Sequence, residues 1–418
     1  MPTHDLSPET QLDRPIREAI DAAVDEHGER IIRMRRRIHA TPEVSGQERA
    51  TTALIAETLR EGGLEPRLMA DDIGVVADID LGAPGPTFVG LRAELDCVIV
   101  NDDKQVPYAS TRPGLCHACG HDVHTSIVAT AGLVAGALRD RLGRLPLHHN
   151  LRLIFQPAEE TAVGARSMIK QGALDGVDAL LAVHVDPFLE VGTVGVRVGP
   201  LTSAAKSFVI RIRGRSGHSA RPHEAIDPIP AAINMVSLLY QIAPRAVDSR
   251  SPMALTVATI SAGHAYNAIP DDAVIGGTLR TTRMEDMETV QRRMESVVRN
   301  VGEATGVETE LEFPYHCPAT DNDARLIGLM SAEATDILGA GGLKEIADAS
   351  MGAEDFGFYQ ELIHAAIVRL GVAGPEERTR HPLHSSLFDV HEAALPIGVR
   401  LLLRSALRAA MGYSDAPG

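Results

Sequence analysis

Short apolar segments rich in β-branched residues recur along the first half of the chain, and each one ends in a group of polar residues. The segments are Val75–Ile79, Thr87–Ala93, Leu151–Phe155 and Ala179–Val185. Helical periodicity separates them at Thr125–Arg139 and Gly164–Gln171. This alternation predicts an α/β sheet covered by helices on both faces. Because sites in open α/β sheets form outside the carboxyl ends of strands, the polar groups predict one shared site.

Two helices are predicted before the first of these strands. Apolar residues at helical spacing predict an amphipathic helix over Ile16–His39. Ser45 and Glu48 have the spacing of a capping box, which predicts a second helix running to about Glu61. The cluster Met34–Ile38, with its three successive arginines, is interpreted as a solvated helix face.

The rhythm of the chain changes from Ser207 onward. The predicted elements are a strand at Ser207–Arg213, a helix at Asp227–Ile242, strands at Ala254–Ser261 and Val274–Thr281, a helix at Met284–Val301 and a strand at Glu308–Phe313. The order β-α-β-β-α-β is that of a ferredoxin-like module inserted into the α/β domain. We therefore expect a first domain formed by residues 1–203 and 314–418, with a final helix at Ala394–Met411, and an inserted domain at residues 204–313.

Composition excludes several classes of partner. The chain has 418 residues, enough for two or three domains, and a formal net charge of -16. That charge argues against a nucleic acid partner, because non-specific affinity for nucleic acid rests on clustered Lys and Arg. The first residues lack the apolar centre of a secretory signal, and no apolar run reaches the length of a membrane span. With only four cysteines, we expect a cytoplasmic protein without a membrane partner.

The stretch Cys116–His124 contains two thiols, three imidazoles and a carboxylate in nine residues. Thiolate and imidazole are ligands that zinc, cobalt and related divalent ions prefer, and Gly120 lets a tight turn direct Cys119 and His121 at one ion. A structural four-thiolate site would need a second cysteine pair, whereas Cys97 and Cys317 are isolated. A redox motif would need both thiols free at a helix start. The sequence therefore favours a metal site.

Two adjacent carboxylates, Glu159 and Glu160, follow a predicted strand. Because neighbouring side chains cannot point the same way, one can bind a metal while the other faces a water molecule. That division supplies both parts of metal-assisted hydrolysis, namely an ion that polarises a carbonyl and a carboxylate that transfers a proton. The alternative is an exposed Glu pair at a helix start. His184 ends the next strand, and His381 and His384 lie near the C-terminus.

A family resemblance rests on seven motifs that occur in the family's order. They are Leu91–Asp96, His117–Thr125, Phe155–Glu160, Gly217–His223, Asn267–Pro270, Gly277–Arg280 and Gly352–Phe356. The chain resembles the di-metal amidohydrolases of the aminoacylase and carboxypeptidase family, in the branch of hippurate and auxin-conjugate hydrolases, from about Ile31 to the C-terminus. The resemblance implies a mixed-sheet α/β metallohydrolase domain with an inserted ferredoxin-like domain for closure and dimerisation.

The resemblance also implies a role for each site residue. Cys119 would bridge two divalent ions of zinc, manganese or cobalt, and four further ligands would complete their coordination, namely His121, Glu160, His184 and His384. Glu159 would be the general base, and Asp96 or Asp122 would orient a ligand imidazole. His218 would stabilise the oxyanion, in relatives often from the partner subunit. Substrate-binding residues would be Asn267 and Arg280, which match positions that bind the substrate carboxylate, together with His223.

The implied activity is hydrolysis of the amide of an N-acyl amino acid or a short peptide-like conjugate by a homodimer. A dipeptidase or carboxypeptidase of the same family and a catalytically silent metal-binding scaffold stay open as alternatives. The chain departs from the family after Asp96, where Cys97–Asp102 lacks a proline and shortens an acid, and at Cys116, which replaces a Met. These departures put the substrate preference in doubt more than catalysis.

Overall fold

The computed structural model describes residues 11–412, which divide into two compact units. Unit 1 contains the described residues up to Gly199, together with Asp321–Ala347 and the chain from Phe358 onward. Unit 2 contains Pro200–Thr320 and a second segment, Asp348–Gly357. The sequence predicts an inserted domain from residue 204 to residue 313, a few residues inside the observed bounds of unit 2 at Pro200 and Thr320. It does not predict that the segment Asp348–Gly357 belongs to this unit.

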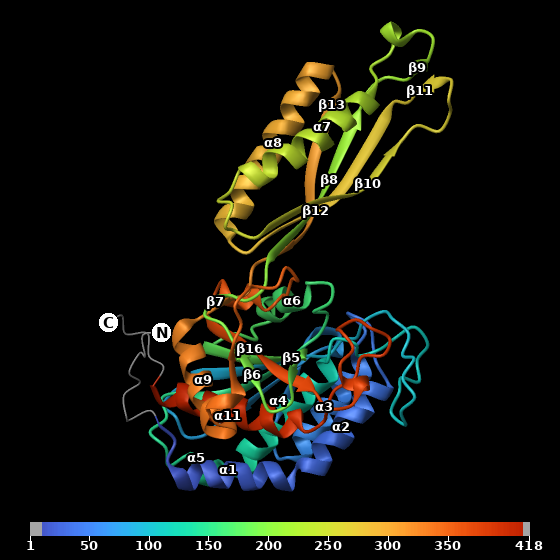
Figure 1. Ribbon diagram of the computed structural model, residues 1–418. Coiled ribbons are helices and arrows are strands. Elements are labelled where there is room, and N and C mark those ends of the chain that lie inside the picture. Colours follow the sequence, from blue (N-terminus) through green and yellow to red (C-terminus); the bar gives the residue numbers. More distant parts are fainter. Residues whose placement is uncertain (1–10, 413–418) are drawn as a thin grey trace. The chain divides into compact units, whose positions relative to one another are not determined.

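Unit 1 is built on a mixed sheet, of which β5, β6 and β16 are labelled in Figure 1. Its strand order is β1-β2-β4-β3-β5-β16-β6-β15. The strands are β1 (Pro66–Leu68), β2 (Val75–Ile79), β3 (Phe88–Glu94), β4 (Asn150–Gln156), β5 (Val177–Glu190), β6 (Val194–Val196), β15 (Leu343–Glu345) and β16 (His364–Ala373). The central strands β4, β3, β5 and β16 are parallel to one another, whereas β2 and β6 pair with them in the antiparallel direction. Two-residue strands β7 (Gly199–Pro200) and β14 (Asp321–Asn322) pair separately. The predicted α/β class with a mixed sheet is confirmed.

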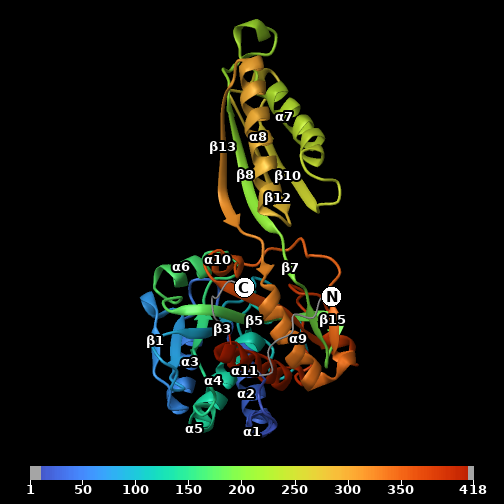
Figure 2. The same cartoon turned by 90° about the vertical axis from the view of Figure 1, so that its left-hand side faces the viewer.

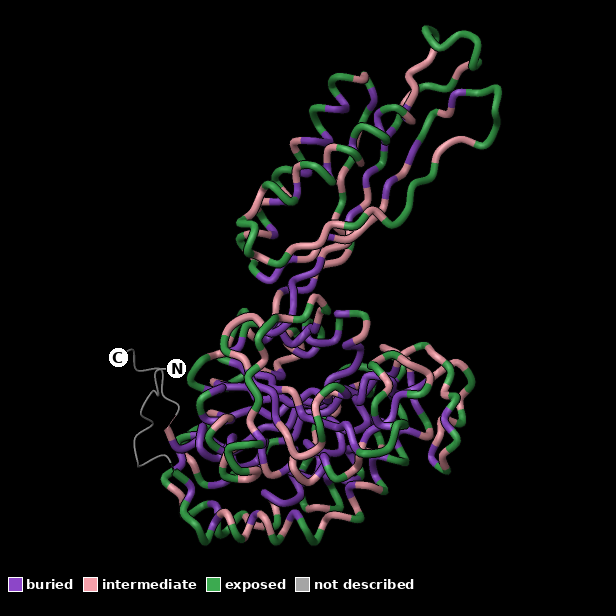
Figure 3. Tube along the Cα trace, in the orientation of Figure 1, coloured by how far each residue is buried: buried purple, intermediate pink, exposed green. Residues whose placement is uncertain are grey.

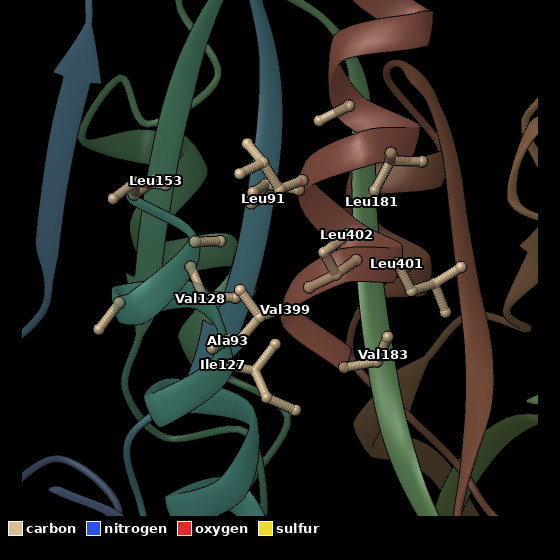
Figure 4. Close-up of a cluster of buried hydrophobic side chains, with 14 of the residues drawn as sticks. Leu91, Ala93, Ile127, Val128, Leu153, Leu181, Val183, Val399, Leu401 and Leu402 are labelled. Atoms are coloured by element: carbon tan, nitrogen blue, oxygen red, sulfur yellow. The ribbon is translucent and has the colours of Figure 1, made fainter. Parts of the chain in front are cut away.

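The helices of unit 1 are α1 (Arg14–Glu26), α2 (Gly28–Ala40), α3 (Arg49–Glu61), α4 (His121–Ala137), α5 (Arg139–Leu142), α6 (Gly164–Lys170), α9 (Ala324–Leu338), α10 (Gly357–Gln360) and α11 (Ala394–Gly412). Figure 4 shows α4 and α11 against strands of the sheet, with side chains such as Ile127 and Leu402 packed on Leu91 and Val183. Figure 3 shows the buried segments gathered in the interior of the unit. The main hydrophobic core therefore lies between the sheet and this helix pair.

Alternation along the central strands gives the two faces of this sheet different chemistry. Leu91 and Ala93 of β3 point into the core, as do Val183 and Val185 of β5. Since successive side chains of a strand point to opposite faces, the residues between them lie on the other face. On that face the strands carry Arg92, Glu94, Gln156 and His184. The polar face is therefore the one on which a site can be built.

Unit 2 has the predicted β-α-β-β-α-β order. Its elements are β8 (Ala204–Arg213), α7 (Pro228–Ile242), β10 (Met253–Ala262), β12 (Asp272–Thr281), α8 (Met284–Thr305) and β13 (Glu308–Cys317), with a short ladder between β9 (Gly217–His218) and β11 (Ala268–Ile269). The antiparallel sheet has the order β10-β12-β8-β13, and Figure 2 shows α7 and α8 on one face of it. Phe208, Ile275 and Met294 belong to the core between sheet and helices. This order of strands is ferredoxin-like.

The predicted helix over Ile16–His39 is wrong as a single element, because it is broken at His27. α1 ends at Glu26 and α2 begins at Gly28. The His27 Nδ1 lies 2.9 Å from the Ala23 carbonyl oxygen, and glycine is the least favourable helix residue after proline. The buried residues Val24 and Ile31 are seven apart, which fits one continuous helical stripe. Hydrophobic periodicity alone therefore hides the break.

The predicted capping box is also wrong. The Ser45 hydroxyl donates to Asp96 Oδ2 at 2.7 Å, and Glu48 accepts from the Gly46 and Ala158 backbone N–H groups. Glu43 instead accepts from the Ala50 and Thr51 N–H groups in the first turn of α3, at 3.2 and 2.7 Å. Ser45 and Glu48 thus connect the loop before α3 to the ends of β3 and β4 instead of capping the helix.

Candidate metal centre

The segment Cys119–His121 is a tight turn that starts helix α4. Gly120 has φ +85°, and a Cβ atom at this position would lie 2.3 Å from Val185 Cγ2. Only glycine tolerates both this backbone conformation and this close approach to β5. The turn therefore brings the Cys119 thiol and the His121 imidazole beside Val185 of β5. The strand continues to Glu190, so the expectation that His184 ends it is wrong. Helix α4 starts at His121, four residues earlier than the predicted start at Thr125.

Three more segments meet this turn. His184 comes from β5, and its Nε2 lies 3.6 Å from Cys119 Sγ. After β4, Ala158 has φ +53°, and the following Glu159 and Glu160 carboxylates lie 3.8 and 3.9 Å from His121 Nε2. His384, which follows β16, donates its backbone N–H to Ala118, and its Nε2 lies 3.6 Å from Glu160 Oε1. The structure thus brings all five sequence-predicted ligands and Glu159 together within unit 1.

Among the groups of possible ligand atoms, two share Cys119, and a third joins His121, Glu159 and Glu160. Cys119, His121 and His184 form one, and Cys119, Glu160 and His384 form the other, with the ligand atoms of each group within 4.8 Å of one another. His121 Nε2 and Glu160 Oε1 are buried and have no hydrogen-bond partner in the described chain. Buried polar atoms are normally satisfied, so a missing partner is indicated. The donors fit divalent transition metal ions, with the thiol common to both groups.

Burial sets the protonation preferences of these ligands. It raises the pKa of the Cys119 thiol well above its usual value and lowers that of the His184 imidazole well below its usual value. A neutral imidazole is the form that binds a metal, whereas a thiol must first lose its proton. A dication at Cys119 would supply the positive charge that a buried thiolate needs.

The imidazoles of the candidate ligands His121 and His184 are oriented by groups behind them. His121 Nδ1 lies 2.9 Å from the Asp96 carbonyl oxygen and 3.2 Å from Asp96 Oδ1. His184 Nδ1 lies 2.8 Å from the Val185 carbonyl oxygen. Asp96 Oδ2 also accepts from the Glu160 N–H at 3.0 Å. Of the two acids that the sequence offers for this role, Asp96 contacts a ligand imidazole, and such contacts fix the tautomer and the ring plane.

Asp122 instead belongs to a buried network around Arg35. Arg35 Nε lies 2.7 Å from Asp122 Oδ2, and Arg35 Nη2 lies 3.0 Å from Asp389 Oδ1, with all three side chains fully buried. His39 Nδ1 also lies 2.7 Å from Asp122 Oδ2. Burial disfavours the His39 imidazolium, but the charge of Asp122 and the hydrogen bonds to Asp102 and Asp122 together outweigh it and raise the pKa of His39 to about 9.

The interpretation of Met34–Ile38 as a solvated helix face is therefore wrong for Arg35. The guanidinium lies on the same stripe of α2 as Ile31 and Ile38, so helical spacing was the signal that could have found it. Only Arg36 and Arg37 match the prediction, since both are exposed.

The two departures from the family pattern meet at Lys104. Its Nζ lies 2.7 Å from Asp102 Oδ1 and 3.4 Å from Cys116 Sγ. Asp102 also accepts from the Ser110 N–H at 2.8 Å, and its Oδ2 lies 3.2 Å from His39 Nε2. Asp102, the shortened acid, thus joins the loop after β3 to the buried network around Arg35. Cys116 contacts Lys104, whereas Cys119 contacts His184, so the two thiols of the Cys-x-x-Cys motif have different partners.

The remaining predicted residues lie in unit 2, and its own geometry separates them. His218 and Asn267 are exposed and lie next to each other at the β9–β11 ladder. There the Ser219 N–H donates to the Asn267 carbonyl oxygen at 3.1 Å. The predicted substrate-binding residue His223, five residues after His218, is also exposed. Arg280 is near the other end of β12, opposite Ala205, and donates to the Met351 carbonyl oxygen at 2.8 Å. At 3.3 Å per residue, the eight steps along the strand from Asp272 to Arg280 span roughly 26 Å. Within one chain, the structure does not bring Arg280 together with His218 or Asn267.

Comparison with known proteins identifies the class to which this fold and ligand set belong. The family model described as Peptidase family M20/M25/M40 matches residues 90–408. The chain belongs to this family, and it is a metal-dependent amidohydrolase. In the described part of the chain, no helix is both long and apolar enough to cross a membrane.

Individual relatives cover nearly the whole chain. It is 38% identical to the N-acetylcysteine deacetylase of Bacillus subtilis over 88% of this chain and 93% of that protein. It is 34% identical to IAA-amino acid hydrolase ILR1-like 4 of Arabidopsis thaliana over 90% of this chain and 85% of that protein. The solved Bacillus subtilis YXEP protein, described as a dinuclear metal-binding peptidase of the M20 family, has a TM-score of 0.78 at 33% identity and covers 92% of this chain and 99% of its own. The family resemblance stated from the motifs is confirmed.

Proposed function

We propose that the protein hydrolyses the amide bond of N-acyl amino acids or related amino-acid conjugates, with two divalent ions bound by Cys119, His121, Glu160, His184 and His384. When bound, such ions lower the pKa of water and polarise a carbonyl. Relatives that include an N-acetylcysteine deacetylase and an IAA-amino acid hydrolase support this substrate class. The observation that carries the proposal is the cluster of these five side chains around one shared thiol, with the Glu159 carboxylate at its margin.

Glu159 is the general base in this proposal. Its carboxylate lies 3.8 Å from His121 Nε2 and beside Glu160, yet Glu160 Oε1 is the oxygen that also approaches His384. In this role the Glu159 carboxylate accepts a proton from an attacking water molecule and returns it to the leaving nitrogen. Arg280 binds the free carboxylate of the substrate, because its planar fork of N–H donors matches a carboxylate.

The test is release of free amino acid from N-acetyl, N-benzoyl and dipeptide substrates, with separate samples loaded with zinc, manganese or cobalt. We expect metal-dependent hydrolysis of N-acyl substrates, and the three samples will show which ion supports it. Preferential hydrolysis of dipeptides would favour the dipeptidase or carboxypeptidase alternative. Absence of hydrolysis across the whole panel with every ion would contradict the proposal.

The protein acts as a homodimer in this proposal, with His218 and Asn267 of one subunit completing the site of the other. Two features of unit 2 support this arrangement. Arg280 and His218 lie too far apart in one chain to contact one small substrate. In addition, β10 is an edge strand, and Ile260 on β10 and Ile233 on α7 are 58% and 63% exposed, which suits pairing with a second copy.

Mixing two inactive variants tests the shared site. Glu159→Gln and His218→Ala each disable every site in their own homodimers. In a mixed dimer, one site combines an intact Glu159 with an intact His218 from the partner. Random exchange of subunits in equal amounts should therefore restore about one quarter of wild-type activity. No recovery, with subunit exchange verified by mass spectrometry and the dimer by light scattering, would mean that each chain completes its own site.

A further inference from the structure

Arg369 lies on the same face of the unit 1 sheet as the ligand His184. On β16, the residues Ala366, Val368 and Leu370 point into the hydrophobic core, so Arg369 between them points to the polar face. β16 is parallel to β5, and Arg369 is in register with His184. Side chains in register on neighbouring strands are adjacent on one face. Arg369 therefore borders the candidate metal centre, on the strand that leads to His384.

Arg369 differs from the other arginines of this sheet because it has no partner. Arg92 donates to Gln156 at 2.9 Å and pairs with Glu94, and Arg152 pairs with Asp78 at 2.6 Å. Among the described residues, no side chain or backbone group forms a hydrogen bond or an ion pair with the Arg369 guanidinium. A partly buried arginine inside an otherwise buried strand normally has a partner.

Nearby groups of this face do not satisfy Arg369 either. Asp186 is the next residue of β5 on this face after His184, but its carboxylate accepts from the Phe188 N–H at 2.8 Å. On the other side of Arg369 the register partner is Gly195, which carries no side chain.

We propose that Arg369 binds a carboxylate of the substrate, in addition to the carboxylate assigned to Arg280. This inference rests on the proposed function. It narrows the substrate class to N-acyl amino acids with an extra carboxylate, on either the acyl group or the amino-acid side chain. Five N–H donors in a rigid fork give a carboxylate two parallel charge-assisted hydrogen bonds, which a neutral group of the same shape cannot accept equally well.

Kinetics on matched substrate pairs tests this assignment. N-acetylglutamate against N-acetylglutamine examines the side chain, and N-succinyl-leucine against N-butanoyl-leucine examines the acyl group. We expect the wild-type kcat/KM for the charged member of one pair to be about 10- to 100-fold higher, mainly through KM. Arg369→Gln should abolish that preference, and Arg369→Lys should restore part of it. Arg60→Gln, at an exposed arginine of α3, should leave the preference unchanged.

A binding measurement separates this inference from the proposed function. Calorimetric titration of metal-loaded protein with succinate and with butyrate reports carboxylate recognition without turnover. Tighter binding of succinate that Arg369→Gln removes supports the inference, even in a protein that hydrolyses none of the amides. The inference is overturned if the wild type shows the same kcat/KM and the same affinity for charged and neutral members. It is also overturned if a preference for the charged member persists in Arg369→Gln.

Discussion

Replacing Glu159 with glutamine should reduce kcat by a factor of about 10² to 10⁴ while the protein still binds its metal ions. Glutamine keeps the shape of the side chain but cannot accept and return a proton at neutral pH. Its neighbour Glu160, which lies 3.6 Å from His384 Nε2, is the carboxylate proposed as a ligand. Steady-state kinetics on the best N-acyl substrate, together with metal content by elemental analysis, measures both effects.

The neighbouring acid is the matched control. Glu160→Gln removes a proposed ligand from the group formed with Cys119 and His384, so it should reduce the bound metal as well as the rate. If the two variants lose metal equally, the division of roles between adjacent carboxylates is wrong. If Glu159→Gln turns over substrate at the wild-type rate, Glu159 is not the base.

Replacing Arg35 with methionine should lower the free energy of unfolding by about 3–5 kcal/mol. The substitution leaves the carboxylates of Asp122 and Asp389 without their common buried counterion. Asp122 directly follows the proposed ligand His121, and Asp389 lies five residues after the proposed ligand His384. We therefore also expect the variant to bind metal less tightly. Urea unfolding and metal titration provide the two measurements.

Arg36 provides the control at the adjacent position. It pairs with Glu392 at 2.6 Å, but its side chain is 45% exposed. Exposed ion pairs contribute only about 0–1 kcal/mol, so Arg36→Met should have a small effect on stability and none on metal binding. Equal destabilisation by the two substitutions would show that the burial of Arg35 in its carboxylate network is not what stabilises the protein.

The sequence predicts the fold where local patterns and neighbouring elements agree. Alternating apolar strands and helical stretches identify the α/β unit, and the β-α-β-β-α-β order identifies the ferredoxin-like insert. The approach of Cys119 and His121 to one point also follows from local chemistry, because Gly120 permits a turn that other residues do not.

Features that depend on partners far away in the chain cannot be predicted from the sequence. The partners of Arg35 lie 87 and 354 residues away, and no local pattern shows that they exist. Glu48 has the spacing of a capping residue, but its partner is the Ala158 N–H, 110 residues away. The segment Asp348–Gly357 joins unit 2 through contacts such as the Ser203 N–H to the Gly352 carbonyl oxygen at 3.0 Å. Motif order likewise does not show that His218 and Arg280 are at opposite ends of one unit.

The insertion of unit 2 into unit 1 has a consequence for synthesis on the ribosome. Cys119, His121, Glu160 and His184 are translated before unit 2, whereas His384 and helix α11 come after it. His384 follows His184 by 200 residues, and at about 5–20 residues per second the nascent chain waits roughly 10–40 s for this last proposed ligand. During that interval the apolar side chains that α11 later covers are uncovered. The first half of this protein is therefore the part that should depend most on chaperones while it is being made.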